Sequence, residues 1–451
     1  MKKNHAYLLF FIVFILLATA IVFNYSRKTK AEQNKQYTLV ARKGVETTGP
    51  EWKMLLDKEK KLLADAKANP ADAKAPLYLA ALYIQEARET GNHAYYDIAA
   101  LRQVNHVLSN DSLNFNALVF KSLICLSQHH FAEGLSVAGR AQQVNPYNAY
   151  VYGLLVDANV EMGYYDSALV NAERMMSIRP DLTSYSRVSY LREIFGDYTG
   201  AIEAMQMAVD AGNKGDENTE WARVQLGGLY EKSGDYKTAA SIYHTSLEAK
   251  PGYAYALAGT ARIAMAAGDY AKAIASLLQA QQTITDNSIQ EELAEAYRLA
   301  GQPQKADAVV KTLITQMAAD ATGKDDGSIG HYADKELAYA YLHSKNNTKA
   351  LEHALMEYNR RPQNIDVNET VAWVYYNNGD YKKALPYMQA ALKTNAQNPI
   401  LLCRAALVYA KNGNNDAAKT LLAKTSAGNP YISGALKDEL MRVLPKFIAG
   451  R

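Results

Sequence analysis

The chain has 451 residues, of which 49% are hydrophobic and 21% charged, a composition that excludes wholesale disorder. Its formal net charge of +3 is small for this length and argues against the dense basic face of a nucleic-acid-binding protein. The two cysteines, Cys125 and Cys403, stand far apart on apolar stretches, so we expect buried thiols rather than a disulfide or a metal site.

The first distinctive element is an apolar segment near the N-terminus. Residues 6–23, AYLLFFIVFILLATAIVF, contain no charged side chain and follow two lysines. As a helix with a rise of about 1.5 Å per residue, this segment would reach about 27 Å, close to the thickness of a bilayer core. We therefore interpret residues 1–26 as a transmembrane anchor or a signal segment.

Two properties of this segment stay open. Ala18-Thr19-Ala20 resembles a signal-peptidase site, but apolar residues continue beyond it, so we favour a retained anchor. The cations after the segment outnumber those before it, which by the positive-inside rule favours a cytoplasmic body. A short basic N-terminal segment before a large domain is instead typical of export. We expect the body on the extracytoplasmic side, with the cytoplasmic face of the membrane as the alternative.

The next stretch, residues 27–50, is polar and lacks helical periodicity, which indicates a linker between the membrane and the body. A helical pattern then begins. Apolar residues within 52–63 mark one face of an amphipathic helix, which we expect to end at Asn69, before Pro70.

The rest of the body is repetitive. GDYKTA at residues 234–239 returns as GDYAKA at residues 268–273, 34 positions later. A glycine of this kind separates consecutive apolar-periodic segments, and His129 and Lys345 take its place twice. The glycines are Gly163, Gly196, Gly234, Gly268, Gly301, Gly379 and Gly413. Most intervals between these markers lie between 33 and 38 residues, and such a period indicates a helical repeat.

Each shared residue has a structural reason. A glycine after a helix adopts the left-handed conformation that satisfies the last carbonyl groups. Five positions beyond the marker stands a small residue, alanine in eight units and Gly134 in one, which lets two helices approach closely. GDYKTA is therefore predicted to join two antiparallel helices. The aspartates placed to cap the second helix are Asp197, Asp235, Asp269 and Asp380.

These residues resemble the tetratricopeptide repeat (TPR), whose pattern is W-x2-L-G-x2-Y, then A-x3-F, then P. Leu226, Gly227 and Tyr230 match the first helix of one unit, and Ala239 with Tyr243 matches the second helix. The resemblance implies an all-α fold: a right-handed α-solenoid of about ten TPR-like helix hairpins plus an N-terminal hydrophobic helix.

The array covers about residues 75–431 and departs from the regular repeat at three places. The hairpin around Gly91 is stretched, residues 212–220 add about four residues, and residues 318–330 add about ten. Residues 433–445 are predicted to form a capping helix. With its terminal helices the solenoid spans residues 51–448, and stacking of its hairpins leaves an extended concave face.

The sequence contains no pattern of catalytic or cofactor-binding residues. G-x-x-x-x-G-K-[ST], H-E-x-x-H, paired C-x-x-C and G-x-S-x-G are all absent. The pair His129-His130 and the residues His331, His343 and His353 lack ligand spacing, so we interpret all five as surface histidines. We expect no enzyme, no cofactor and no metal.

In TPR proteins the first helix of each hairpin lines the groove, so the resemblance implies a protein or peptide partner on the concave face. Aromatic and cationic side chains there would anchor the partner with a large contact area. We expect partner contacts at Tyr190, Trp221, Tyr255, Arg262, Arg298, Lys335, Tyr339 and Trp373, with Tyr150, Tyr332 and Tyr376 also facing the groove.

The sequence thus favours a non-catalytic scaffold, membrane-tethered or exported, that binds a protein partner along this face. The alternative is an exported carbohydrate-binding protein that stacks the same aromatic rings on sugars. Its hydroxyl-binding carboxylates would be Glu291, Glu295, Asp366 and Glu369. Core packing of the tyrosines competes with both interpretations, because the chain contains 32 tyrosines.

Overall fold

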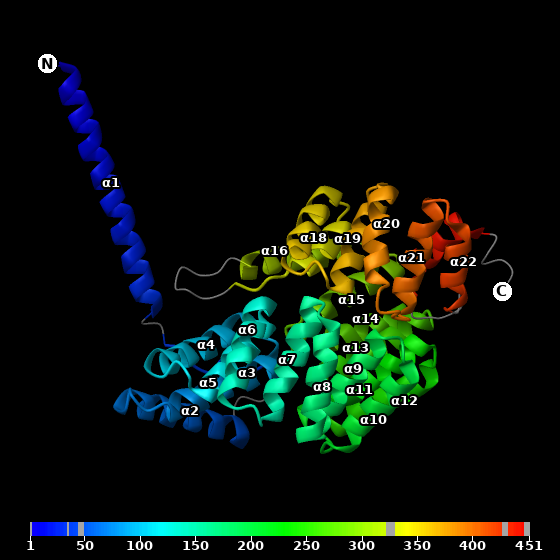
Figure 1. Cartoon of the computed structure of the whole chain (residues 1–451), viewed down its shortest axis with the longest axis horizontal. Coiled ribbons are helices and arrows are strands. Elements are labelled where there is room, and N and C mark those ends of the chain that lie inside the picture. Colours follow the sequence, from blue (N-terminus) through cyan, green and yellow to red (C-terminus); the bar gives the residue numbers. More distant parts are fainter. Residues whose placement is uncertain (1, 34–35, 44–48, 322–329, 426–431, 446–451) are drawn as a thin grey trace.

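The fold is described by a computed structural model that covers residues 2–33, 36–43, 49–321, 330–425 and 432–445, with side chains for 11–27 in the first range. Within these residues every regular element is a helix (Figure 1). The all-α fold class expected from the sequence is confirmed for this part of the chain.

The first helix, α1 (Lys2–Gln33), stands apart from the body in Figure 1. It contains the predicted anchor, residues 6–23, of which residues 6–10 lie outside the described side chains. Its large apolar side chains from Phe11 to Phe23 are exposed. Among the residues that the structure describes, no helix has the length and apolarity that crossing a membrane requires.

Residues 36–43 pack on the body without regular secondary structure. Tyr37 and Leu39 are buried, and the hydroxyl of Tyr96 accepts a hydrogen bond from the N–H of Val40 (2.9 Å). We call residues 36–43 the strap. Its contacts show that this stretch is held on the protein surface along its main chain.

The structure therefore differs from the linker predicted for residues 27–50. The first part of that stretch belongs to α1, and the strap is docked on the helices that follow. Residues 34–35 and 44–48 lie outside the described residues. The next helix, α2 (Pro50–Ala68), packs against α3 and ends directly before Asn69, as predicted.

Ten helix hairpins follow within the described residues, and neighbouring helices pack in chain order. The first helices of the hairpins are α3 (Lys74–Thr90), α5 (Phe115–Ser127), α7 (Ala149–Met162), α9 (Leu182–Ile194), α11 (Glu217–Ser233), α13 (Ala254–Ala266), α15 (Asn287–Leu299), α17 (Asp334–His343), α19 (Ile365–Asn377) and α21 (Pro399–Lys411). The second helices are α4 (His93–Asn110), α6 (Phe131–Val144), α8 (Tyr165–Ile178), α10 (Tyr198–Asp210), α12 (Tyr236–Ala249), α14 (Tyr270–Ala280), α16 (Pro303–Ala321), α18 (Asn347–Arg360), α20 (Tyr381–Ala391) and α22 (Asn415–Ala423). The predicted capping helix is α23 (Gly434–Val443), and residues 322–329 of the predicted insertion lie outside the described residues.

The hairpin turns form for the reasons that the sequence suggests. The marker glycines have positive φ, and His129 and Lys345 adopt the same left-handed conformation at φ 59° and 58°. The alanines five positions beyond the markers are fully buried between helices. At Gly134, a Cβ atom would lie 2.8 Å from the Leu126 side chain, so the close approach there requires glycine.

The predicted caps form at three of four positions. The side chains of Asp197, Asp235 and Asp269 accept a backbone N–H of the following helix at 2.9, 3.0 and 3.1 Å. The capping prediction is wrong for Asp380, because its carboxylate pairs with Lys383 (3.1 Å) and makes no capping hydrogen bond. An exposed lysine in the first turn of α20 competes successfully for that carboxylate.

The hairpins are wound into two stacked layers, one above the other in Figure 1. Helices α3–α14 form the lower winding and α15–α22 the upper winding. After six hairpins the chain returns over its own start, where the N–H of Thr285 donates to the carbonyl of Thr90 (3.0 Å). One hairpin farther, the N–H of Tyr332 donates to the carbonyl of Gln128 (3.1 Å). We call this contact surface between the windings the seam.

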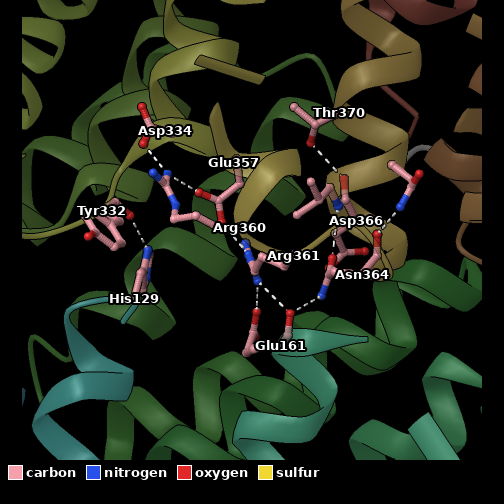
Figure 2. Close-up of polar contacts among 12 residues, drawn as sticks. His129, Glu161, Tyr332, Asp334, Glu357, Arg360, Arg361, Asn364, Asp366 and Thr370 are labelled. Carbon is pink, nitrogen blue, oxygen red and sulfur yellow. Dashed lines mark hydrogen bonds and ion pairs between the residues drawn. The ribbon is translucent and has the colours of Figure 1, made fainter. Parts of the chain in front are cut away.

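The seam continues between α7 and α19, as Figure 2 shows. Arg361 forms an ion pair with Glu161, and Asn364 Nδ2 donates to the Glu161 carbonyl (3.0 Å). Gly163 lies so close to Gln363 that a Cβ atom would fall 2.2 Å from the carbonyl carbon. Hairpin turns of the lower winding thus dock against the segments that precede first helices of the upper winding.

Apolar packing also crosses the seam. Tyr165, Leu191 and Ile194 of the lower winding share one hydrophobic cluster with Ile365 and Leu401 of the upper winding. Because the two layers share a core, the windings form one body rather than an open spiral.

The five histidines interpreted as surface residues are distributed differently. His343 is exposed, as expected. His129, His130 and His331 are partly buried in the seam, and His353 binds Asp334 (2.6 Å). The surface interpretation is wrong for His129, His130 and His331 because the seam joins segments that are about 200 residues apart in the sequence. It is wrong for His353 because this residue pairs with Asp334 of its own winding.

Candidate partner-binding channel

The first helices of the lower winding surround a channel. A cavity of about 810 Å³ lies between α3, α5, α7, α9, α11, α13 and α15. The seam closes this ring, since the segment before α15 is bonded to the end of α3. The concave face predicted from the sequence is therefore a partly enclosed channel in this part of the array.

Four aromatic side chains on successive first helices line the cavity. They are Tyr150, Tyr190, Trp221 and Tyr255. Tyr190 is 41% exposed and Trp221 36%, so both present accessible surface to the channel. Desolvation inside the channel raises the pKa of the Tyr150 and Tyr190 hydroxyls. The hydroxyl of Tyr255 already has a partner within the protein, because it donates a hydrogen bond to Asp286 (3.2 Å).

The cations of the channel wall are paired within the protein. Arg187 forms two hydrogen bonds to Asp157 (2.9 and 2.6 Å). Arg262 contacts Glu231 (2.9 Å) and Glu292 (2.9 Å). These carboxylates outweigh the desolvation of the Arg262 guanidinium and raise its pKa well above its ordinary value. The positive charges of both arginines are therefore already neutralised within the protein.

The eight predicted contact residues fall into two groups. Tyr190, Trp221, Tyr255 and Arg262 line the cavity together. The other four are Arg298, Lys335, Tyr339 and Trp373, and they stand on α15, α17 and α19 of the upper winding. The structure does not bring these four to the same cavity.

The upper group is organised by a residue that the sequence pattern does not single out. The guanidinium of Arg404 lies over the rings of Trp373 (4.9 Å) and Tyr339 (5.2 Å) and forms an ion pair with Glu369 (3.0 Å). The available signal was the register, since Arg404 stands nine positions before Gly413, as Arg187 stands before Gly196.

Two further groove predictions are corrected. Tyr332 lies in the seam, where its ring stacks on His130 at 3.9 Å. Tyr376 is 6% exposed and donates to Glu439 (2.5 Å) of the capping helix. Both tyrosines are used for packing, which is the competing interpretation that the abundance of tyrosine suggests.

One carboxyl group beside the channel is unpaired. Glu291 Oε1 is buried and has no hydrogen-bond partner among the described residues. Burial, together with the charge of Glu336, raises the pKa of Glu291 to about 8. Glu291 is therefore mostly protonated at neutral pH.

Known proteins show similarity to parts of this chain. The family model described as tetratricopeptide repeat matches residues 230–291 and 375–430. No curated protein sequence matches the chain. Among solved structures, a tetratricopeptide repeat protein from Parabacteroides merdae is 15% identical with a TM-score of 0.38, covering 57% of this chain and 97% of that one.

Two other solved structures show similar levels of likeness. YrrB, described as a TPR protein with an unusual peptide-binding site, is 18% identical with a TM-score of 0.29, covering 45% of this chain and 97% of its own. The human IFIT1 dimer with m7Gppp-AAAA is 15% identical with a TM-score of 0.44, covering 67% and 68%. The family match identifies tetratricopeptide repeats within residues 230–291 and 375–430.

Proposed function

We propose that this protein is a non-catalytic scaffold that holds a segment of a protein partner in the channel of the lower winding. The observation that carries the proposal is the aromatic lining of an 810 Å³ cavity whose wall cations are already paired. Exposed aromatic rings at the centre of a concave surface are the side chains that most often dominate binding energy.

The strap supports a recognition mode for the partner. Tyr95 Oη accepts the N–H of Thr38 (3.1 Å) and donates to its carbonyl (2.8 Å), and Tyr83 Oη donates to the carbonyl of Tyr37 (2.9 Å). Tyrosine hydroxyls of this protein therefore already bind a polypeptide main chain. The hydroxyls of Tyr150 and Tyr190 offer the same chemistry inside the channel.

The test replaces two channel aromatics in the full chain. Tyr190→Ala with Trp221→Ala should reduce partner capture about tenfold or more, because such central anchors carry most of the binding energy. Capture is measured by crosslinking at the native site followed by quantitative mass spectrometry. The matched control is Tyr78→Ala with Tyr147→Ala, since both tyrosines are exposed outside the cavity lining. Equal capture by the channel variant and the wild type would reject the channel as the binding site.

A carbohydrate ligand is the second candidate, and Glu291 favours it. Its protonated carboxyl group, next in the chain to the lining residue Glu292, could donate to a sugar hydroxyl. Two of the other carboxylates expected to serve sugars are occupied: Arg404 holds Glu369 (3.0 Å), and Arg298 lies 3.8 Å from Glu295. A protein partner is therefore the better candidate, and binding of defined glycans to the purified chain would reverse this preference.

We further propose that residues 6–23 attach the scaffold to a membrane and that the body faces the extracytoplasmic side. The apolar sequence of this segment and the exposure of its side chains from Phe11 to Phe23 support the attachment. Protease added to cells after any outer barrier is opened should cleave the body. Full protection would place the body on the cytoplasmic face instead.

A further inference from the structure

The seam contains a cluster of histidines that face each other across the two windings. The rings of His129 and His331 lie 4.3 Å apart, and His129 Nδ1 lies 2.8 Å from the Tyr332 carbonyl oxygen. His130 Nε2 lies 2.6 Å from the Gly330 carbonyl oxygen. Each of these contacts joins a residue of the lower winding to one that precedes α17 in the upper winding.

We propose that the seam is a pH-sensitive gate of the channel, closed while His130 and His331 are neutral and opened by their protonation in mildly acidic solution. As a device that controls partner access, this gate rests on the proposed function. The separation of the windings itself needs no partner and is measured without one.

Two adjoining imidazoles cannot both gain a proton without like-charge repulsion in a partly buried site. Burial, followed by the charge of His129, lowers the pKa of His331 to about 4. Burial also lowers the pKa of His130, despite its hydrogen bond to Gly330. The closed seam therefore disfavours the charged form of both histidines.

Other charged groups face the cluster from every element packed on it. They are His93 and Asp97 of α4, Glu133 of α6, Glu336 of α17 and Arg360 of α18. Asp97 accepts hydrogen bonds from Ser127 (2.6 Å) and Gln128 (2.5 Å), and Glu133 pairs with Lys121 (3.0 Å). Ser127, Gln128 and Lys121 all belong to the lower winding, so their pairing is the same whether the seam is open or closed.

The remaining two groups belong to the upper winding and differ in sign. Glu336 favours protonation of His331, but burial outweighs this attraction, since the pKa of His331 is still lowered. Arg360 opposes protonation of His130 and is held by Asp334 and Glu357 of its own winding. The electrostatic balance of the closed seam therefore favours neutral histidines.

The direction of the pH effect follows from linkage. In separated windings, His331 would titrate near its ordinary value of about 6.5, above its value in the closed seam. The open state then binds protons more strongly, so lowering the pH favours it. Between pH 7.5 and pH 5.5, His331 alone should shift the equilibrium toward the open state by about tenfold.

Hydrogen exchange of seam amides in the full chain tests this gate. The reporters are the N–H groups of Tyr332, Thr285 and Ile365, which donate across the seam to Gln128, Thr90 and the Tyr165 hydroxyl, respectively. After correction for intrinsic exchange, protection of all three should fall about tenfold between pH 7.5 and pH 5.5. Loss of protection at Tyr332 alone would indicate local opening rather than separation of the windings, and it would overturn the proposed gate.

Variants separate the histidine effect from general acid sensitivity. His331→Gln should reduce the pH dependence at all three amides, leaving His130 to titrate in the seam, and His130→Gln provides a second variant if the first opens the seam at neutral pH. The matched control is His343→Gln, because this histidine lies outside the seam and its ring contacts Arg298 of the same winding. An unchanged pH dependence in both seam variants would overturn the proposal.

Discussion

Two kinds of interface hold this molecule together, and they differ in how far apart their residues lie in the sequence. Between consecutive hairpins, fully buried alanines such as Ala239 and Ala273 let helices pack closely, and each contact joins nearby segments. In the seam, Glu161 meets Arg361 and Gly163 meets Gln363, each pair 200 residues apart.

This difference explains how a repeat protein can form an enclosed site. Stacking alone makes a ribbon whose stability is a sum over neighbouring units. The seam adds contacts between the first and second windings, so that the channel is bounded by a ring of first helices. Perturbing one interface at a time therefore separates the stability of the ribbon from the closure of the channel.

The largest effect is expected from Arg361→Ala. Arg361 is 3% exposed and pairs with both Glu161 and the buried Glu357. Without Arg361, Glu161 loses this ion pair and Glu357 keeps only Arg360, and breaking these partly buried pairs should cost about 3 kcal/mol of stability. The measurement is chemical denaturation, with small-angle scattering to detect separation of the windings.

The control for this variant is Lys383→Ala, which removes an exposed ion pair with Asp380 (3.1 Å) outside the seam. Exposed pairs contribute little, so the unfolding midpoint should stay unchanged. Equal effects of the two substitutions would contradict the special role of the seam.

The next effect compares two glycines with the same backbone conformation. Gly163 (φ +79°) touches Gln363 in the seam, whereas a Cβ atom on Gly379 (φ +78°) would meet no heavy atom within 4 Å among the described residues. Gly379→Ala should cost about 1 kcal/mol for the left-handed conformation alone. Gly163→Ala should cost about 1–3 kcal/mol more because its Cβ overlaps the opposing main chain.

Denaturation midpoints of the two glycine variants give this difference directly. If both alanines cost the same, the close approach at Gly163 does not contribute to closure of the seam.

These comparisons also show what the sequence can and cannot predict. The repeat period predicts the hairpins because Gly163 and Gly379 occupy the same turn position. Both adopt the left-handed backbone conformation that favours glycine. The sequence does not distinguish them, since the contact that makes Gly163 different lies 200 residues away. The channel follows the same rule: the first-helix register predicts that Trp221 and Arg262 line it.

Whether a channel residue is already paired within the protein is harder to predict than its position. Arg262 is held by Glu231, which belongs to the preceding hairpin, and by Glu292, which belongs to the following one. These pairings depend on the rotation between neighbouring hairpins, which a repeat pattern does not specify. The same limit explains why spacing alone places the seam histidines at the surface.

A smaller effect is expected at Glu291 of α15, whose charge pairing differs from that of the seam carboxylates. Seam carboxylates such as Glu161 are paired, whereas Glu291 is protonated with a pKa of about 8. Its folded pKa lies above its unfolded value of about 4.3, so stability should fall as the pH rises from about 5 toward 8. Glu291→Gln should remove this loss, stabilising the protein at pH 8 by about 1–3 kcal/mol and much less at pH 5.

Unfolding midpoints of this variant and the wild type at both pH values provide the measurement. The same stability difference at pH 5 and pH 8 would show that Glu291 does not titrate in this range.

The smallest effect comes from two helix caps that differ by their seam contacts. Asn364 caps α19 by accepting the N–H of Val367 (3.0 Å), and Asn114 caps α5 by accepting the N–H of Ala117 (3.2 Å). Asn364 also donates across the seam to the Glu161 carbonyl (3.0 Å). Loss of either cap should cost about 1 kcal/mol. Asn364→Ala should cost about 1 kcal/mol more than Asn114→Ala because it also removes the hydrogen bonding across the seam. Equal denaturation midpoints of the two variants would show that hydrogen bonding by Asn364 does not contribute to closure of the channel. Ion pairs and apolar packing across the seam would then account for it.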